Sequence, residues 1–271
     1  MTCSTQYPLL LVHGAGFRDH KHPNYWGRIP KALEARGAVL CYGRQDGWGS
    51  VEGNAAVIKA SLEKFLAETG CEKVNIIAHS KGGLDARYMI SSLGMAPYVA
   101  SLTTMATPHH GSKTVDALLR APAFLRKTGA FFMNGFSRIT GDKKPDFYRA
   151  SGQFSTEEAA AFNARNPDAP GVYYQSYTAV MNNACSDLLM FWPYLLVRLL
   201  EGESDGMVAP AAAQWGNFRG VLRGASNRGI SHSDQVDIRR MNFTRKAREG
   251  RVSDMRQVYV EIVSELKQMG L

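Results

Sequence analysis

The stretch that decides the fold is Ile77-Ala78-His79-Ser80-Lys81-Gly82-Gly83. A short apolar run of strand length, residues 74–78, leads into it, and a helical pattern begins at Gly82. A serine in such a strand-to-helix turn has strained backbone angles and an exposed hydroxyl, and the residues two before and two after it must be small. Ala78 and Gly82 meet this requirement. The stretch therefore predicts a serine nucleophile, with an ordinary βα turn of a Rossmann-like unit as the alternative.

The composition is that of one globular domain covering residues 1–271. Hydrophobic residues make up 45% of the chain and charged residues 21%, which is enough for a sizeable core. The net charge of +8 would favour anionic surfaces such as lipid headgroups or nucleic acid. No nucleic-acid motif accompanies this charge, so we expect a solvated basic surface and no nucleic-acid partner. The sequence leaves the oligomeric state open.

Two features bear on the compartment. The four cysteines form no C-x-x-C pair and no metal-ligand spacing with histidine. The first strand starts within about seven residues of the N-terminus, which leaves no room for a signal peptide. From the sequence as given we therefore expect a cytoplasmic protein. A secreted enzyme whose leader peptide was replaced would have the same kind of sequence. The longest apolar stretch, residues 188–197, is too short to span a bilayer, so we expect a buried or lid helix and no transmembrane segment.

Strands and helices alternate along the chain. The expected strands are residues 7–12, 38–42, 73–78, 102–106 and 172–181. The expected helices are residues 24–36, 51–69, 82–92 and 257–269. This alternation predicts a mostly parallel central sheet flanked by helices, with the active site at the carboxyl ends of the strands.

Four segments resemble bacterial triacylglycerol lipases of the α/β-hydrolase superfamily. They are Leu10-Leu11-Val12-His13-Gly14, the serine turn, Glu203-Ser204-Asp205-Gly206-Met207-Val208 and Ser231-His232-Ser233-Asp234. The resemblance extends from about Pro8 to about Val236. It implies an α/β-hydrolase fold, a Ser-acid-His triad in that chain order, and ester hydrolysis.

The base must then follow Ser80, which excludes the early histidines. His79 lies on the strand beside the serine, and we expect it to point to the opposite side of the sheet. His109 and His110 follow a strand in a rigid turn, where loop packing is the simpler interpretation. His232 comes late, in a loop from which an imidazole can reach the serine, and is therefore our candidate base.

The acid is sought before His232. Asp205 lies in a Ser-Asp-Gly turn that can direct its carboxylate toward a neighbouring loop. Its role would be to hold the imidazole of His232 in the right tautomer. Asp187, Glu201 and Glu203 are rivals nearby. The resemblance favours Asp205, because Asp-Gly-Met-Val is the stretch that carries the acid in these lipases.

An oxyanion hole requires two backbone N–H groups aimed at the developing charge. One should be the amide of Lys81, the residue after the nucleophile. The resemblance assigns the other to Ala15, between Gly14 and Gly16 in the loop after the first strand. The alternative, a phosphate-binding loop, lacks the lysine or helix start that such a loop needs.

A helical lid or cap insertion is expected at about residues 113–171. Its apolar positions at helical spacing are Val115, Leu118, Leu119, Pro122, Phe131, Phe132, Phe136 and Ile139. Its basic positions are Lys113, Arg120, Arg126, Lys127, Arg138, Lys143 and Lys144. This pattern is typical of an amphipathic lid on an anionic interface and equally of a cap packed over the sheet. A mobile lid implies a lipase, and a fixed cap implies an esterase for smaller substrates.

The resemblance also implies a structural calcium ion, since these lipases have a metal-binding acid two residues after the histidine. Asp234 has that spacing, and Asp187 is the best second ligand in the sequence. Calcium needs several further oxygen ligands. The alternative is a salt bridge from Asp234 to Arg239 or Arg240.

Taken together, these residues predict a serine ester hydrolase, foremost a lipase that cleaves acylglycerol esters through an acyl-enzyme. The same triad would serve a carboxylesterase, a thioesterase or a polyester depolymerase. The alternative outside enzymology is a hydrolase-like binding scaffold with an inactive triad. No cofactor is expected for the chemistry, and the expected partner is a lipid or ester substrate.

Overall fold

The computed structural model describes residues 1–271 except 17, 20–23, 140 and 244–248. Its centre is a sheet of six parallel strands in the order β2-β1-β3-β4-β5-β6. The strands are β1 (Leu9–Val12), β2 (Leu40–Tyr42), β3 (Val74–His79), β4 (Val99–Met105), β5 (Tyr173–Ala179) and β6 (Asn217–Leu222). The predicted α/β fold with a parallel sheet is therefore confirmed.

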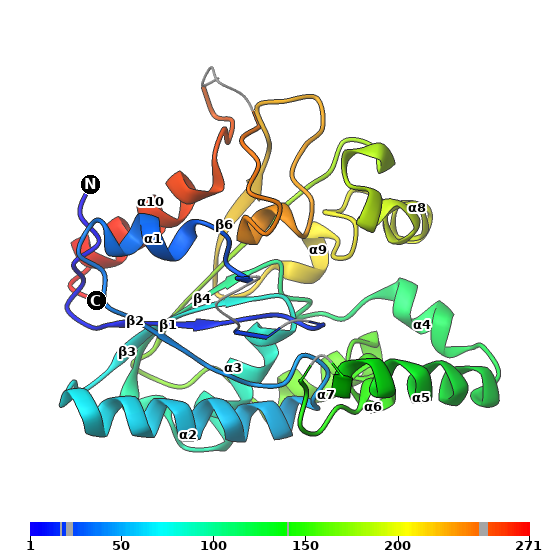
Figure 1. Ribbon diagram of the computed structural model, residues 1–271, viewed down its shortest axis with the longest axis horizontal. Coiled ribbons are helices and arrows are strands. Elements are labelled where there is room, and N and C mark those ends of the chain that lie inside the picture. Colours follow the sequence, from blue (N-terminus) through cyan, green and yellow to red (C-terminus); the bar gives the residue numbers. More distant parts are fainter. Residues whose placement is uncertain (17, 20–23, 140, 244–248) are drawn as a thin grey trace.

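Helices cover both faces of this sheet (Figure 1). One face carries α2 (Val51–Thr69) and α3 (Lys81–Ser92), and the other carries α1 (Ile29–Glu34) and α10 (Met255–Gln268). The side chains of β1 alternate between the two layers. Leu9 and Leu11 pack in the cluster that includes α1 and α10, whereas Leu10 and Val12 pack in the cluster that includes α2 and α3. This alternation explains why β1 is apolar at every position.

In the described residues between β4 and β5, all the regular elements are helices. They are α4 (Lys113–Leu119), α5 (Ala123–Ile139), α6 (Phe147–Gly152) and α7 (Thr156–Arg165). Helices α4, α5 and α6 lie at the end of the sheet away from the two termini (Figure 1). Within α5 the side chains of Phe132 and Phe136, both predicted to be apolar lid positions, lie outside the described residues.

Two further helices follow β5, namely α8 (Phe191–Leu200) and α9 (Pro210–Ala213). The apolar stretch predicted to be a buried or lid helix forms α8 together with the short turn before it. Tyr194 and Val197 are buried, while Leu188, Trp192 and Leu199 are 73–81% exposed. No helix in the described part of the chain is long and apolar enough to cross a membrane.

The boundaries agree with the sequence best where a cap marks them. Helix α2 starts after Ser50, whose hydroxyl accepts the N–H of Gly53, and ends at Gly70 in the left-handed conformation, as predicted. The helix predicted from residue 24 begins only at Ile29, where Pro30 occupies the first turn. Strand β6 was not predicted, because it is a partly exposed edge strand without an apolar pattern.

Candidate functional site

Ser80 lies where the sequence places a nucleophile, in the turn between β3 and α3. Its backbone is strained, with φ of 54° and ψ of −131°. The turn is held by Ser80 N–H donating to Met105 O at 2.9 Å and by the Thr107 hydroxyl donating to Ser80 O at 2.8 Å. The requirement for small neighbours has a direct cause at Gly82, since a Cβ there would lie 2.3 Å from His13 O. Ser80 is itself half-buried.

The side chain of Lys81 does not line the turn that holds Ser80. Its ammonium is buried and lies 2.5 Å from the carboxylate of Asp85, one turn along α3. Asn54 of α2 donates to the other oxygen of Asp85 at 3.0 Å. Burial raises the pKa of Asp85 despite these partners. The buried pair joins α3 to α2 and leaves only the main chain of Lys81 facing the serine turn.

The loop after β1 approaches Ser80 closely. A Cβ added to Gly14 would lie 2.8 Å from the Cβ of Ser80. The N–H of Gly14 donates to Tyr25 Oη at 3.0 Å, and the N–H of Gly16 donates to Gly47 O at 3.0 Å. Within the described residues the N–H of Ala15 has no such partner. Lys81 is the first residue of α3, so its N–H also has no acceptor within the helix. The N–H groups of Ala15 and Lys81 are therefore both available as hydrogen-bond donors near Ser80.

His232 and Asp205 meet across a loop-to-loop contact. The Nδ1 atom of His232 lies 2.7 Å from Asp205 Oδ2, and the N–H of His232 donates to Asp205 O at 2.8 Å. Asp205 is completely buried, and its Oδ1 accepts the N–H groups of Met207 and Val208. These donors fix the position of the carboxylate beside the imidazole.

The ring of His232 also reaches the residue next to the serine. Its centroid lies 4.5 Å from that of the His79 ring. The expectation that His79 points to the opposite side of the sheet was therefore wrong. Burial, and then the nearby charge of His232, hold the pKa of His79 well below its ordinary value, so this ring stays neutral. His79 forms a neutral wall beside His232.

The rival acids are engaged elsewhere. Glu201 accepts hydrogen bonds from the hydroxyls of Ser112 and Thr114, and thus joins α8 to α4. Glu203 pairs with Arg223 at the surface, at 2.8 Å. Asp187 accepts the hydroxyl of Ser231 and does not contact the His232 ring. Only Asp205 of the four lies against the imidazole.

The rival histidines are structural. His109 is buried, stacks on Trp215 and contacts the hydroxyl of Thr104 at 3.0 Å. Burial, and then the charge of Arg87, hold the pKa of His109 well below its ordinary value. The exposed His110 contacts Gln214 O. The interpretation of these two residues as loop packing is confirmed.

Two contributors were missed from the sequence. Gln235 donates to Asp205 Oδ2 at 2.6 Å and shares that oxygen with His232. Tyr25 receives the N–H of Gly14, and its hydroxyl lies 2.5 Å from Nδ1 of His79. Tyr25 and His79 are 54 residues apart in the chain, so no local pattern indicates their contact. Gln235 follows His232 by three residues, and this spacing is the only signal available.

Asp187 and Asp234, the residues predicted to bind calcium, both lie beside the His232 loop. All four of their carboxylate oxygens accept hydrogen bonds from protein donors. Arg239 pairs with Asp234 at 2.7 Å and lies 3.4 Å from Asp187. In the described part of the chain, no group of three or more His, Cys, Asp or Glu side chains could hold a metal. The pair therefore does not fit a calcium ion, and the alternative salt bridge from Asp234 to Arg239 is confirmed.

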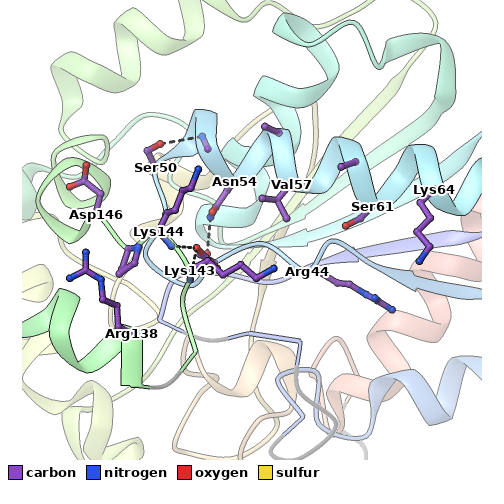
Figure 2. A pocket seen from close by; sticks show the side chains of 16 residues that line it. Arg44, Ser50, Asn54, Val57, Ser61, Lys64, Arg138, Lys143, Lys144 and Asp146 are labelled. Atoms are coloured by element: carbon purple, nitrogen blue, oxygen red, sulfur yellow. Dashed lines mark hydrogen bonds between the residues drawn. The ribbon is translucent and has the colours of Figure 1, made fainter.

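A large basic cavity lies away from the serine. Its volume is about 1010 Å³, and it opens between α2 and the segment that follows α5 (Figure 2). Five cationic residues line it, namely Arg44, Lys64, Arg138, Lys143 and Lys144. Ser80, His232 and Asp205 are not part of its wall. The cavity is therefore a separate feature of the molecule.

The chain has curated relatives among the triacylglycerol lipases. Triacylglycerol lipase 2 of Saccharomyces cerevisiae is 28% identical over 93% of this chain and 77% of its own length. A triacylglycerol lipase of Pseudomonas fragi is 26% identical over 99% of this chain and 98% of its own length. A third, from Pseudarthrobacter phenanthrenivorans, is 35% identical, but this match covers 61% of the chain and only about half (56%) of the relative. No protein-family model matches the chain.

Solved structures place the fold in the same group. A metagenomic carboxyl esterase matches all of this chain and 78% of its own, with a TM-score of 0.71 and 17% identity. The lipase of Staphylococcus hyicus matches 97% of this chain and 96% of its own, with a TM-score of 0.68 and 16% identity. Such low identities bear on the fold alone. The fold is thus the α/β-hydrolase fold, and together with the curated relatives it supports the conclusion that the chain is a carboxylic ester hydrolase.

Proposed function

We propose that Ser80, His232 and Asp205 are the catalytic triad of this hydrolase. The observation that carries the proposal is the contact of the buried Asp205 carboxylate with Nδ1 of His232, at 2.7 Å. This contact fixes the tautomer in which Nδ1 carries a proton and Nε2 is free to accept one. The imidazole packs on His79, the residue before Ser80. The strained serine turn and the neutral His79 ring support the same assignment.

The proposed reaction has two halves. Ser80 Oγ attacks the ester carbonyl while His232 Nε2 takes the hydroxyl proton, and the oxyanion accepts hydrogen bonds from Ala15 N–H and Lys81 N–H. Collapse of this intermediate expels the alcohol, to which His232 returns the proton, and leaves an acyl-Ser80 ester. A water molecule then attacks the acyl group, again with His232 as base. This second half releases the carboxylic acid and restores Ser80.

The proposed substrate is an acylglycerol with a long acyl chain, which makes the enzyme a lipase. The names of the curated relatives support this substrate. Exposed apolar side chains support it independently. Phe124, Phe131 and Ile139 of α5 are 67–86% exposed, and Trp192 and Leu199 of α8 are 73% and 80% exposed. Exposed apolar residues in this number are typical of surfaces that meet a lipid or a partner.

We assign the lid to α5, residues 123–139 of the insertion at 113–171. The end of this segment is anchored, because Asp142 accepts the N–H groups of residues 47–48 and Asp46 accepts those of residues 143–144. Helix α7 is anchored as well, since Asn163 contacts both Arg87 and His109 O. Helix α4 is also tied, because Glu201 accepts the hydroxyl of Thr114 and Asp116 accepts the hydroxyl of Thr156. Helix α5 is the proposed lid because its side chains Phe124, Phe131 and Ile139 are exposed. Movement of α5 at a lipid surface would change the access of the substrate to Ser80.

The anionic character of that surface is also a proposal. The basic cavity of Figure 2 adjoins the anchored end of the lid, with Arg138, Lys143 and Lys144 on the lid side. Cations at this place would attract anionic headgroups while α5 lies on the acyl region. Weaker activity on vesicles at high ionic strength would follow from this attraction.

A chain-length profile tests the lipase assignment. The wild type and Ser80→Ala are assayed on nitrophenyl esters of two to sixteen carbons, below and above the solubility limit of each ester. A lipase would prefer long chains, and its rate would rise when an emulsion forms. A preference for short, dissolved esters would make the protein a carboxylesterase, and faster cleavage of acyl-thioesters would make it a thioesterase. Loss of all activity in Ser80→Ala is the control for a contaminating enzyme.

A further inference from the structure

The loop that carries His232 is closed by a guanidinium group. Arg239 donates to both carboxylate oxygens of Asp234, at 2.9 and 2.7 Å, in a fork geometry. Its third nitrogen donates to Ser186 O at 3.0 Å, and its Nε lies 3.4 Å from Asp187 Oδ2. Both carboxylates are at least 97% buried, so their charges need a nearby cation, and Arg239 lies within ion-pair distance of both.

These contacts lead directly to the proposed base. Ser231, the residue before His232, donates its hydroxyl to Asp187 at 2.7 Å and its N–H to Asp234 at 3.1 Å. The N–H of Asp234 returns a hydrogen bond to the Ser231 hydroxyl. Arg239 thus holds the two carboxylates, the carboxylates hold Ser231, and Ser231 sets the position of His232.

The two buried carboxylates require a cation, and the arrangement of their oxygen atoms suits the guanidinium group of an arginine. Calcium takes six to eight oxygen ligands at about 2.3–2.6 Å in proteins. Each oxygen of Asp187 and Asp234 instead accepts an N–H or O–H of this chain. The planar fork of Arg239 satisfies three of the oxygen atoms that face it, including a carbonyl.

We propose that Arg239 is a positioning residue for His232, which holds its loop with a built-in cation where the resembled lipases use a calcium ion. The proposal rests on the proposed function, since it takes His232 to be the base. It implies that catalysis does not depend on a divalent metal. It also implies that the charge of Arg239 matters for kcat and not for binding of the substrate.

The test compares wild type, Arg239→Ala and Arg239→Lys, with Arg223→Ala as the matched control. Arg223 also pairs with a carboxylate, Glu203, but at the surface and away from the His232 loop. Each variant is assayed on a soluble nitrophenyl ester for kcat and KM, in EDTA and in millimolar calcium. We expect Arg239→Ala to lose about 10- to 100-fold in kcat, with KM within about twofold, because a misplaced base slows only the chemical step. Arg239→Lys should recover part of the loss, and Arg223→Ala should equal the wild type.

Calcium sharpens the test. It should leave the wild type unchanged, in activity and in melting temperature, because Arg239 already compensates both carboxylates. In Arg239→Ala the two buried carboxylates are left without their cation, and millimolar calcium should restore part of kcat. A wild type that loses activity and stability in EDTA would overturn the proposal, as would Arg239→Ala with wild-type kcat. Failure of both lysine and calcium to recover any activity would also overturn it.

Failure of the proposed function is distinguishable from these outcomes. A wild type that hydrolyses no ester at all contradicts the proposed function. The effect of Arg239 on the loop is then tested separately, by amide hydrogen exchange at residues 231–237. Faster exchange in Arg239→Ala than in Arg223→Ala supports its hold on the loop, and equal exchange in the two variants overturns it.

Discussion

The serine turn and the helical cover at the same end of the sheet are built in opposite ways. Around Ser80, His232 and Asp205 the side chains are buried or half-buried, and His232 and Gln235 both contact the Asp205 carboxylate. On α5 and α8, large apolar side chains such as Phe131 and Trp192 are exposed. The difference separates two tasks. The buried region fixes the geometry of the reaction, and the exposed region offers apolar area to a substrate that is itself an interface.

The largest expected effect tests the buried region. Replacing Ser80 or His232 by alanine should lower kcat by roughly 10⁶, because the members of a triad act as a unit. The double variant should be no slower than either single one. Steady-state kinetics on a soluble nitrophenyl ester measures this, with His110→Ala as the control at an exposed histidine. If His110→Ala or His109→Ala lost activity while His232→Ala kept it, the base would be misassigned.

A smaller loss is expected at the acid. Asp205→Ala should lower kcat by roughly 10⁴, because the imidazole survives but no longer has a fixed tautomer. Glu203→Gln, at a rival acid that pairs only with the surface residue Arg223, is the matched control and should stay near wild type. A Glu203→Gln enzyme as slow as Asp205→Ala would point to a general loss of folding. Circular dichroism of both variants separates that case.

The exposed region should respond to a different substrate. Trp192→Ser and Leu199→Ser remove apolar side chains from α8, and we expect about a tenfold loss of rate on emulsified long-chain esters. Activity on a dissolved short ester should be unchanged, because the side chains of Trp192 and Leu199 are largely exposed to solvent. The ratio of the two rates is the measurement. Equal losses on both substrates would mean that α8 supports the fold and does not contact the interface.

The smallest effect concerns stability and pH. Burial keeps the pKa of His109 well below its ordinary value of 6.5, so the folded chain binds fewer protons there than the unfolded chain. Stability from this residue is complete above pH 6.5 and falls as the pH drops below it, by up to about 1.4 kcal/mol per pH unit. Urea unfolding at pH 5 to 8 should therefore show a shallower pH dependence for His109→Gln than for wild type. Parallel curves would contradict a neutral buried His109.

Much of the fold was predictable because its signals are local. The cap at Ser50, the glycine at residue 70 and the apolar run before Ser80 all lie within the elements that they define. Strand β6 was missed because its half-exposed edge position produces no apolar pattern. The late start of α1 places Pro30 in the first turn, where a helix does not need the backbone N–H that proline lacks. Local sequence signals thus predict most helices and strands, and tertiary contacts explain where the prediction fails.

The site divides in the same way. Ser80, Asp205 and His232 were predictable from chain order and from resemblance to known lipases. The orientation of His79 was not, because it depends on Tyr25 from another segment of the chain. Arg239 could be named only as one alternative partner of Asp234, since its contacts with Asp187 and Ser186 O cross about 50 residues of sequence. Spacing along a chain indicates which residues can react, and packing decides which groups position them.

The assignment of Ser80 and His232 is tested most directly by labelling with a fluorophosphonate probe, followed by peptide mapping. The account predicts one adduct, on the peptide that contains Ser80, absent from Ser80→Ala and formed far more slowly in His232→Ala. His109→Ala should label at the wild-type rate if it remains folded. An adduct on any other residue, or undiminished labelling of His232→Ala, would contradict the proposed triad.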